Sequence, residues 1–276
     1  MAKYKEIKGT RIQTVSSDPP APDLGQVWYN SPGGAFKGLV LGAASWATGG
    51  SMSLARTYLA GCGTQTAAAA FSGFRVSPNA RVSDTEEYNG ASWGSGGALP
   101  SIRDSGAGAG TQTAALMIGG FAPPIMNNTE EYDGSSWSSG GNLPAAIQQQ
   151  AASGTQTAGL SYGGIAPGYQ SATKEYNGAS WTAGGDLVTA RNLLRGGGDN
   201  TSAFVAGGSP TTSTEIYDGS SFATSTALPT GSQWAAAAGT QAAGLFFGGN
   251  GAPPGTTAAT FEFTGPAPAT KTLSTD

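Results

Sequence analysis

The sequence contains no histidine, a single cysteine and few charged residues. Without histidine, the chain cannot form Ser-His-Asp or Cys-His nucleophile systems, histidine-ligated metal sites, or the commonest acid-base group near neutral pH. Cys62 has no second cysteine with which to form a disulfide inside the chain. Because the chain has no histidine to activate its thiol, we interpret Cys62 as a small buried side chain. These absences predict a protein that is not an enzyme and that holds no cofactor and no metal.

Charge is also scarce, at 11% of residues, and the net charge is −4 with a pI near 4.8. No run of lysine or arginine occurs in the body of the chain, which argues against nucleic acid as a partner. No stretch of roughly 18 apolar residues is present, so we expect no membrane insertion. The first residues, MAKYKEIKGTRIQ, lack the apolar segment of a secretory signal, so we expect synthesis in a cytoplasm.

What the chain does have is a repeated unit. The phrase TEEYNGASW at residues 85–93 returns as TEEYDGSSW at 129–137, TKEYNGASW at 173–181 and TEIYDGSSF at 214–222. A second phrase, GTQTAAAAFSG from Gly63, occurs in five copies with the same spacing. The aromatic anchors at positions 46, 93, 137, 181 and 222 are separated, by subtraction, by 47, 44, 44 and 41 residues. A period of this size is typical of propellers and solenoids.

Each unit has the pattern of four short β-strands. Apolar runs that end at Gly-Gly predict buried strands. Asn-Gly or Asp-Gly pairs between two β-type runs predict two-residue turns of the primed types, at Asn89-Gly90, Asp133-Gly134, Asn177-Gly178 and Asp218-Gly219. No stretch carries a helical period with caps, so the predicted class is all-β. The last unit has Phe263 in the tyrosine position but no tryptophan after it, so we expect a strand at Trp46 to close the last blade.

A known family shares this pattern. An apolar run ending in Gly-Gly, a variable loop, Tyr-Asp or Tyr-Asn, and then tryptophan resembles the kelch repeat from about Trp46 to Gly265. The resemblance implies a kelch-like β-propeller of four-stranded blades, and the unit count implies five blades, with six as the alternative. Phe222 in place of tryptophan and Ser72-Gly73 in place of Gly-Gly depart from the pattern. The phrases GTQTAA and EEYDGSSW also look like kelch-like proteins of marine bacteriophages.

Residues 1–37 differ in composition from the propeller region, 38–276. The segment from Val15 to Pro22 is Pro-rich and predicts an extended linker. GQVWYNSPGGAFKG, from Gly25 to Gly38, predicts a hairpin with Trp28 and Tyr29 on one arm. The segment resembles N-terminal parts of phage tail-fibre and other virion proteins, which implies an arm that docks on the particle. Its candidate docking residues are Lys3, Lys5, Lys8, Arg11, Trp28 and Tyr29. A frayed terminus beside a capping hairpin is the alternative.

Three sets of recurring side chains were candidates for a site. Pairs such as Glu86-Glu87 and Glu130-Glu131 occupy the same place in each unit, so we interpret them as exposed strand residues without a catalytic role. The glutamine of each GTQT phrase is interpreted as part of a polar ladder in the inner strands. Candidate ligand-face residues are three arginines that each follow a Gly-Gly pair and two loop aromatics, namely Arg56, Arg103, Arg191, Tyr169 and Trp234. For the arginines, hydrogen bonding to loop carbonyls is the favoured alternative to an anionic ligand.

Two functions agree with these features. The first is a non-enzymatic structural component of a phage particle, such as a tail fibre, a decoration protein or a head or tail accessory protein. It would be localised to the virion, bound to other virion proteins through its N-terminal arm, with an oligomeric state set by virion symmetry. The alternative is a host-surface recognition module that binds a glycan or receptor through blade loops. Loops that vary in length and content from unit to unit allow either role.

Overall fold

The computed structural model describes residues 13–17, 27–32, 35–38, 48–251, 255–256 and 260–265. The chain divides into two compact units, Met1–Thr48 and Gly49–Asp276, whereas the sequence suggested a boundary after residue 37. The described residues form strands and no helix, which confirms the all-β prediction. It follows that no helix in the described part of the chain could cross a membrane.

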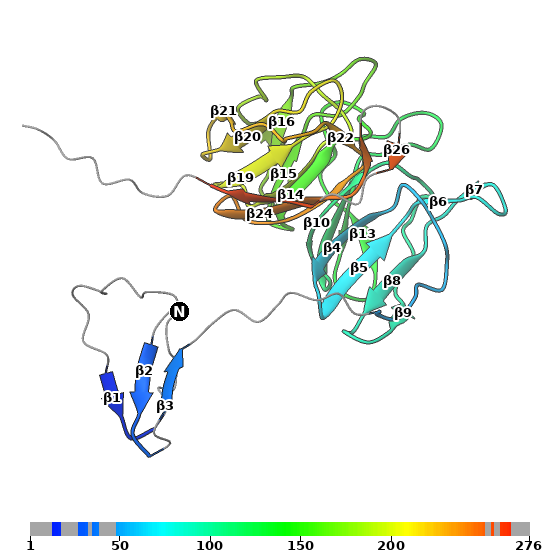
Figure 1. The fold of residues 1–276 in the computed structure, drawn as a ribbon. Coiled ribbons are helices and arrows are strands. Elements are labelled where there is room, and N and C mark those ends of the chain that lie inside the picture. The colour runs from blue at the N-terminus through cyan, green and yellow to red at the C-terminus, as the bar shows by residue number, and fades with distance from the viewer. Residues whose placement is uncertain are drawn as a thin grey trace, which may run out of the picture. The chain divides into compact units, whose positions relative to one another are not determined.

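The second unit is a five-bladed β-propeller, whose sheets are drawn in Figure 1. Residues of the innermost strands of all five blades line a central channel. Four of its blades are antiparallel sheets of four strands taken in chain order. These strands are β4 (Ala60–Thr64), β5 (Ala67–Phe71), β8 (Thr85–Tyr88) and β9 (Trp93–Ser95); β10 (Ala107–Thr111), β11 (Ala114–Ile118), β12 (Thr129–Tyr132) and β13 (Trp137–Ser139); β14 (Ala151–Thr155), β15 (Ala158–Tyr162), β16 (Thr173–Tyr176) and β17 (Trp181–Ala183); and β18 (Arg195–Gly198), β19 (Ala203–Ala206), β20 (Thr214–Tyr217) and β21 (Phe222–Ser225). The first blade also carries a small hairpin of β6 (Phe74–Arg75) and β7 (Ala80–Arg81).

The fifth blade has three described strands, β23 (Ala236–Gly239), β24 (Ala243–Phe247) and β27 (Thr260–Thr264). A second small sheet, β22 (Ser232–Gln233), β25 (Asn250–Gly251) and β26 (Gly255–Thr256), lies in the same repeat. The innermost strands contact one another in the order β4, β10, β14, β18 and β23. The prediction of five blades is therefore confirmed, and the predicted closing strand at Trp46 lies outside the described residues.

Aromatic residues that end each repeat hold neighbouring blades together. Trp137 packs on Tyr132 of its own blade and on Phe71 of the preceding blade, with both ring centroid distances 4.9 Å. Its indole Nε1 donates to Thr85 Oγ1 of the preceding blade over 2.9 Å. Trp181 donates to Thr129 in the same way. Aromatic pairs of this kind contribute about 0.5–1.5 kcal/mol beyond the burial of their area, so the repeated tryptophan is a structural anchor.

The turn after each tyrosine differs from the prediction. Trp137 pairs with Tyr132, and the amide of Asp133 donates to Ser136 O over 3.1 Å, so the two central residues are Gly134 and Ser135. Asp133 Oδ1 accepts from the amides of Ser135 and Ser136. The aspartate thus forms an Asx turn, and only Gly134 takes a positive φ, of 89°. The sequence-based prediction placed the turn on Asp133-Gly134, one residue too early. The reason is that the Asp133 carboxylate accepts amide hydrogen bonds that a backbone carbonyl would otherwise accept.

The GTQT glutamines also differ from the prediction. Gln112 lies in the turn between β10 and β11, outside either strand. Its Nε2 donates to Tyr88 O over 2.7 Å and to Ala68 O over 3.0 Å, both in the preceding blade. Gln156 and Gln241 make the same pair of bonds to their own preceding blades. These glutamines therefore join blades across the ring, where the sequence suggested a ladder within strands.

The first unit contains a three-stranded sheet of β1 (Gln13–Val15), β2 (Val27–Asn30) and β3 (Ala35–Gly38). The predicted hairpin is confirmed, since β2 and β3 are antiparallel and Tyr29 pairs with Phe36. Val15, which the sequence placed in the linker, instead ends β1, which runs parallel to β2. The candidate docking residues Trp28 and Tyr29 lie in β2, and the basic candidates at positions 3, 5, 8 and 11 lie outside the described residues.

Candidate ligand site at the channel mouth

The three predicted arginines are inside the blades. The side chains of Arg56, Arg103 and Arg191 are fully buried. Each donates to backbone carbonyls of its own blade; Arg191, for example, binds Gly207 O and Ser213 O. These are the carbonyl bonds that the sequence favoured for the arginines. A ligand outside the blades cannot reach these guanidinium groups, so they do not form a ligand face.

Each of these arginines is paired with a buried glutamate of the same blade. The distances between guanidinium nitrogen and carboxylate oxygen are 3.3 Å for Arg56 and Glu86, 3.1 Å for Arg103 and Glu130, and 3.0 Å for Arg191 and Glu215. The interpretation of these glutamates as exposed strand residues is therefore wrong. Burial raises the pKa of Glu130, although the charge of Arg103 acts in the opposite direction.

In the first three blades, the glutamate directly before the tyrosine has a different partner. Glu87 Oε1 accepts from the hydroxyl of Tyr132 in the next blade over 2.5 Å, and Glu131 accepts from Tyr176. Tyr217 donates to Glu175 in the same way. Both sets of glutamates thus have structural partners that account for their recurrence. The described residues also contain no cluster of three or more acidic or cysteine side chains that could hold a metal.

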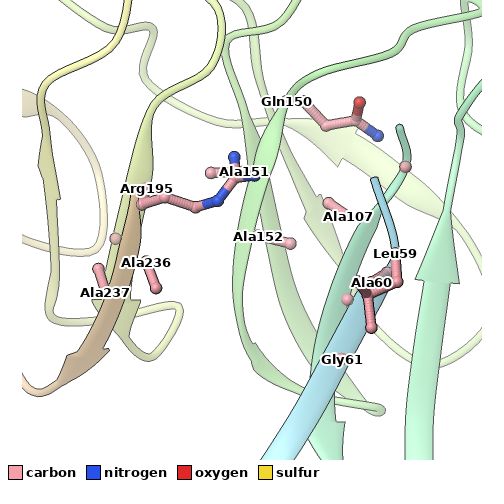
Figure 2. A pocket seen from close by; sticks show the side chains of 13 residues that line it. Leu59, Ala60, Gly61, Ala107, Gln150, Ala151, Ala152, Arg195, Ala236 and Ala237 are labelled. Carbon is pink, nitrogen blue, oxygen red and sulfur yellow. The ribbon is translucent and has the colours of Figure 1, made fainter. Parts of the chain in front are cut away.

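The wall of the central channel consists mostly of glycine and alanine, and its larger residues are Leu59, Gln150 and Arg195. Innermost strands of all five blades line a cavity of about 200 Å³. Four blades place alanine at the same position, namely Ala60, Ala107, Ala151 and Ala236, and the remaining blade places Arg195 there. Figure 2 shows the Arg195 side chain extending from β18 across this cavity toward Ala151. Among the described residues that line the cavity, Arg195 alone is charged.

Arg195 has few polar partners. Its Nη1 donates to Leu194 O over 2.8 Å, and it forms no ion pair with any described residue. Burial lowers the pKa of this guanidinium, and the nearby Tyr162 acts in the opposite direction. An arginine remains charged near neutral pH even so. The channel therefore carries a positive charge, and none of the described residues that line it supplies a carboxylate.

One residue per blade, just before the innermost strand, forms a rim around the channel. These rim residues are Tyr58, Ser105, Gln149, Leu193 and Trp234, and all have φ between 54° and 60°. Along the rim, the amides of Ser105, Gln149 and Leu193 donate to the carbonyl of the rim residue one blade earlier. The left-handed backbone is thus part of the ring structure, and the side chain at each rim position differs from blade to blade.

The two aromatic rim residues meet where the fifth and first blades adjoin. The rings of Tyr58 and Trp234 have centroids 4.9 Å apart and planes at 50°. The two side chains remain 47% and 38% exposed. They line a groove of about 730 Å³ together with Arg195, Thr57 and Asn250 and the backbone between them. The groove and the channel cavity share Arg195, Leu59 and Ala236, so one opening leads to the other.

Of the five predicted ligand-face residues, only Trp234 lies in this groove. Tyr169 is exposed on a loop of the third blade, where its hydroxyl is 3.3 Å from Ser209 Oγ. Sequence reasoning missed Tyr58 and Arg195. The available signal was the alignment of the repeats, because an arginine in a position that is alanine elsewhere has no structural role common to all blades.

The fold and the rim define the class of this protein as a five-bladed β-propeller with an open channel mouth. Among solved structures, it is similar to the structure of YjhT, with a TM-score of 0.63 and 14% identity over 76% of this chain and 81% of YjhT. This likeness supports the propeller fold alone. No protein-family model matches the chain, and no curated protein matches it.

Proposed function

We propose that this chain is a non-enzymatic component of a phage particle, in which a kelch-like propeller is presented on the virion by the N-terminal unit. The observation that carries the proposal is the division into two compact units, Met1–Thr48 and Gly49–Asp276. Their compositions differ, since the basic cluster at positions 3–11 and the Pro-rich segment lie in the first unit and the repeats fill the second. A small sheet joined to a repeat domain is an arrangement suited to attachment at one end and display at the other.

Particle association tests this proposal. Purified virions would be incubated with the tagged full chain and with a chain that lacks residues 1–37, and bound protein would be measured after sedimentation. We expect the full chain to sediment with the particles and the shortened chain to remain in solution. Equal sedimentation of both chains, or of neither, would contradict attachment through the N-terminal segment.

A second function, recognition of a host surface, is favoured by one observation. Tyr58 and Trp234 place two exposed aromatic rings beside each other at the channel mouth, at rim positions that are serine, glutamine and leucine in the other blades. Neighbouring exposed aromatic side chains typically mark binding sites. Display on a virion and recognition by the displayed propeller are compatible, and the two roles reside in different units.

A further inference from the structure

We infer that the groove between the fifth and first blades binds an acidic saccharide, meaning a sugar ring that carries a carboxylate or a sulfate. In this site, Tyr58 and Trp234 contact the apolar face of the sugar, and Arg195 pairs with its acidic group. The inference rests on the recognition role proposed above and not on attachment to a particle.

The size of the groove is suitable for a small ligand. Its volume of about 730 Å³ lies within the range of roughly 300–1,000 Å³ that is usual for ligand pockets. It opens at the mouth of the channel and continues inward to Arg195. A ligand that enters from solvent therefore meets the aromatic pair first and the charge behind it.

The aromatic pair favours a sugar over a flat aromatic ligand. Its planes are inclined at 50°, which leaves no parallel slot for a purine or pyrimidine base. An inclined pair instead forms a shallow cradle for a puckered ring with an apolar face. Thr57 and Asn250 line the same groove, and the hydroxyl and side-chain amide of these residues can donate hydrogen bonds to sugar hydroxyls and accept hydrogen bonds from them.

Arg195 accounts for the acidic group. No aspartate or glutamate is found among the described residues that line the channel cavity and the groove. A partly buried cation without a counter-ion is costly, and a bound anion would remove that cost. The planar guanidinium matches the two oxygens of a carboxylate or sulfate. Because the whole chain carries a net charge of −4, this local positive site would also select its ligand by charge.

The test is titration calorimetry on the full chain with four probes. These are oligogalacturonate for a carboxylate, a carrageenan oligosaccharide for a sulfate, maltohexaose as a neutral sugar, and adenosine monophosphate. We expect one or both acidic sugars to bind at least roughly tenfold more tightly than the other two probes, and high salt to weaken that binding. Equal binding of maltohexaose, tighter binding of the nucleotide, or no binding of any probe would overturn the inference.

Variants separate the groove from the rest of the rim. Asparagine tolerates a left-handed backbone, so Tyr58→Asn and Trp234→Asn remove the rings without imposing strain. Each is expected to weaken acidic-sugar binding roughly tenfold or more. Ser105→Asn is the matched control, since Ser105 has φ 57° on the same rim and does not line the groove. Equal losses in the control variant would contradict the assignment.

Arg195→Met is expected to abolish the preference for acidic over neutral sugar, and Arg195→Lys is expected to retain part of it. A thermal melt of each variant shows whether it is folded. The salt dependence of acidic-sugar binding to the unchanged protein is a second, independent test of the role of the Arg195 charge. The virion sedimentation experiment should be unaffected by all four groove variants. Sugar binding without particle association would contradict the proposed attachment alone, and particle association without sugar binding would contradict this inference alone.

Discussion

At the residue scale, the third blade contains a buried hydroxyl, that of Thr173, which faces the fourth blade and which comparison with the other repeats explains. Thr173 occupies the place of Thr85 and Thr129, but Phe222 stands where the other blades have tryptophan, and no described residue bonds Thr173 Oγ1. Phe222 and Trp181 pack on their own tyrosines at 4.7 and 4.8 Å, so the two slots have similar geometry. The substitution removed the donor and left the acceptor.

We therefore expect Phe222→Trp to stabilise the protein by about 1 kcal/mol, because the indole would bond Thr173. Urea denaturation measures the change. The matched control is the double variant Phe222→Trp with Thr173→Val, in which the hydrogen bond cannot form and the gain should disappear. An equal gain in the double variant would show that ring size alone is responsible.

The buried ion pairs give a second prediction at this scale. Arg191→Met leaves the carboxylate of Glu215 buried, with only the amides of Val188 and Thr189 as partners. Removing one partner of a buried pair costs about 3–5 kcal/mol. We expect this loss in urea denaturation, and we expect it to be smaller when Glu215→Met is added. A double variant less stable than the single one would contradict this account.

The sequence held information on these arginines and glutamates beyond their recurrence from blade to blade. Where arginine is absent, the glutamate is absent as well: the third blade has Ile147 with Lys174, and the fifth has Ser232 with Phe261. Recurrence alone suggested exposed glutamates, because burial cannot be read from the residue type. The joint loss of both partners is the pattern expected of a buried pair.

At the scale of elements, turn chemistry sets a dependence on pH. Hydrogen bonds from Ser135 and Ser136 lower the pKa of Asp133 to about 2, and those from Ser220 and Ser221 lower that of Asp218. A carboxylate whose pKa is lower in the folded state stabilises the fold above its unfolded pKa, and this contribution is lost as the pH falls toward the folded value.

Asparagine occupies this position naturally in the first and third blades, at Asn89 and Asn177, and accepts the same amide bonds. The double variant Asp133→Asn with Asp218→Asn should therefore fold normally. Between pH 5 and pH 2 we expect its melting temperature to fall less than that of the unchanged protein. Thermal melts across this pH interval measure the difference. Melting temperatures that fall in parallel for the two proteins would contradict a stabilising role of the two carboxylates.

The elements themselves could be predicted because the repeats align strand with strand. The aromatic anchors, the Gly-Gly ends and the hairpin at residues 25–38 all have local signals. The turn at Asp133 was displaced by one residue because side chain and backbone compete for the same donors. Gln112 was misplaced because its partners, Ala68 and Tyr88, belong to another blade, and no local pattern reports a contact between blades.

At the scale of the whole molecule, the fifth blade has a groove that the described residues do not fill. An apolar groove of about 310 Å³ lies beside β27, and its lining includes Phe204, Thr214 and Phe263. Thr214 is the counterpart of Thr85 and Thr129, which bind tryptophan in their blades. The sequence-based prediction that Trp46 supplies this tryptophan stays a prediction, since residue 46 lies outside the described residues.

The closing-strand prediction implies that Trp46→Ala lowers the melting temperature of the propeller, because removing a tryptophan from such an apolar groove typically costs about 3–5 kcal/mol. Trp28→Ala, in β2 of the first unit, is the control and should leave that transition unchanged. Calorimetry of the full chain reports both transitions. No effect of Trp46→Ala would show that the ring closes without this residue.

The candidate site could not be predicted at this scale from local sequence. Tyr58, Arg195 and Trp234 come from three blades, and the ring alone brings them together. Trp234 was identified as a loop aromatic, but its partner Tyr58 is 176 positions earlier by subtraction. Only the closure of the ring makes the first and last repeats neighbours.

The structure of the rim determines how substitutions can change the ligand that this propeller binds. From Tyr58 to Leu193, backbone hydrogen bonds join each rim residue to the next, and these bonds do not depend on the side chains that the residues carry. Substitutions at Tyr58, Ser105, Gln149 and Trp234 therefore alter what the mouth presents while the scaffold stays the same. A library at these four positions, limited to residues that tolerate a left-handed backbone, should yield folded propellers of many specificities, so that adaptation to a new ligand requires no new fold.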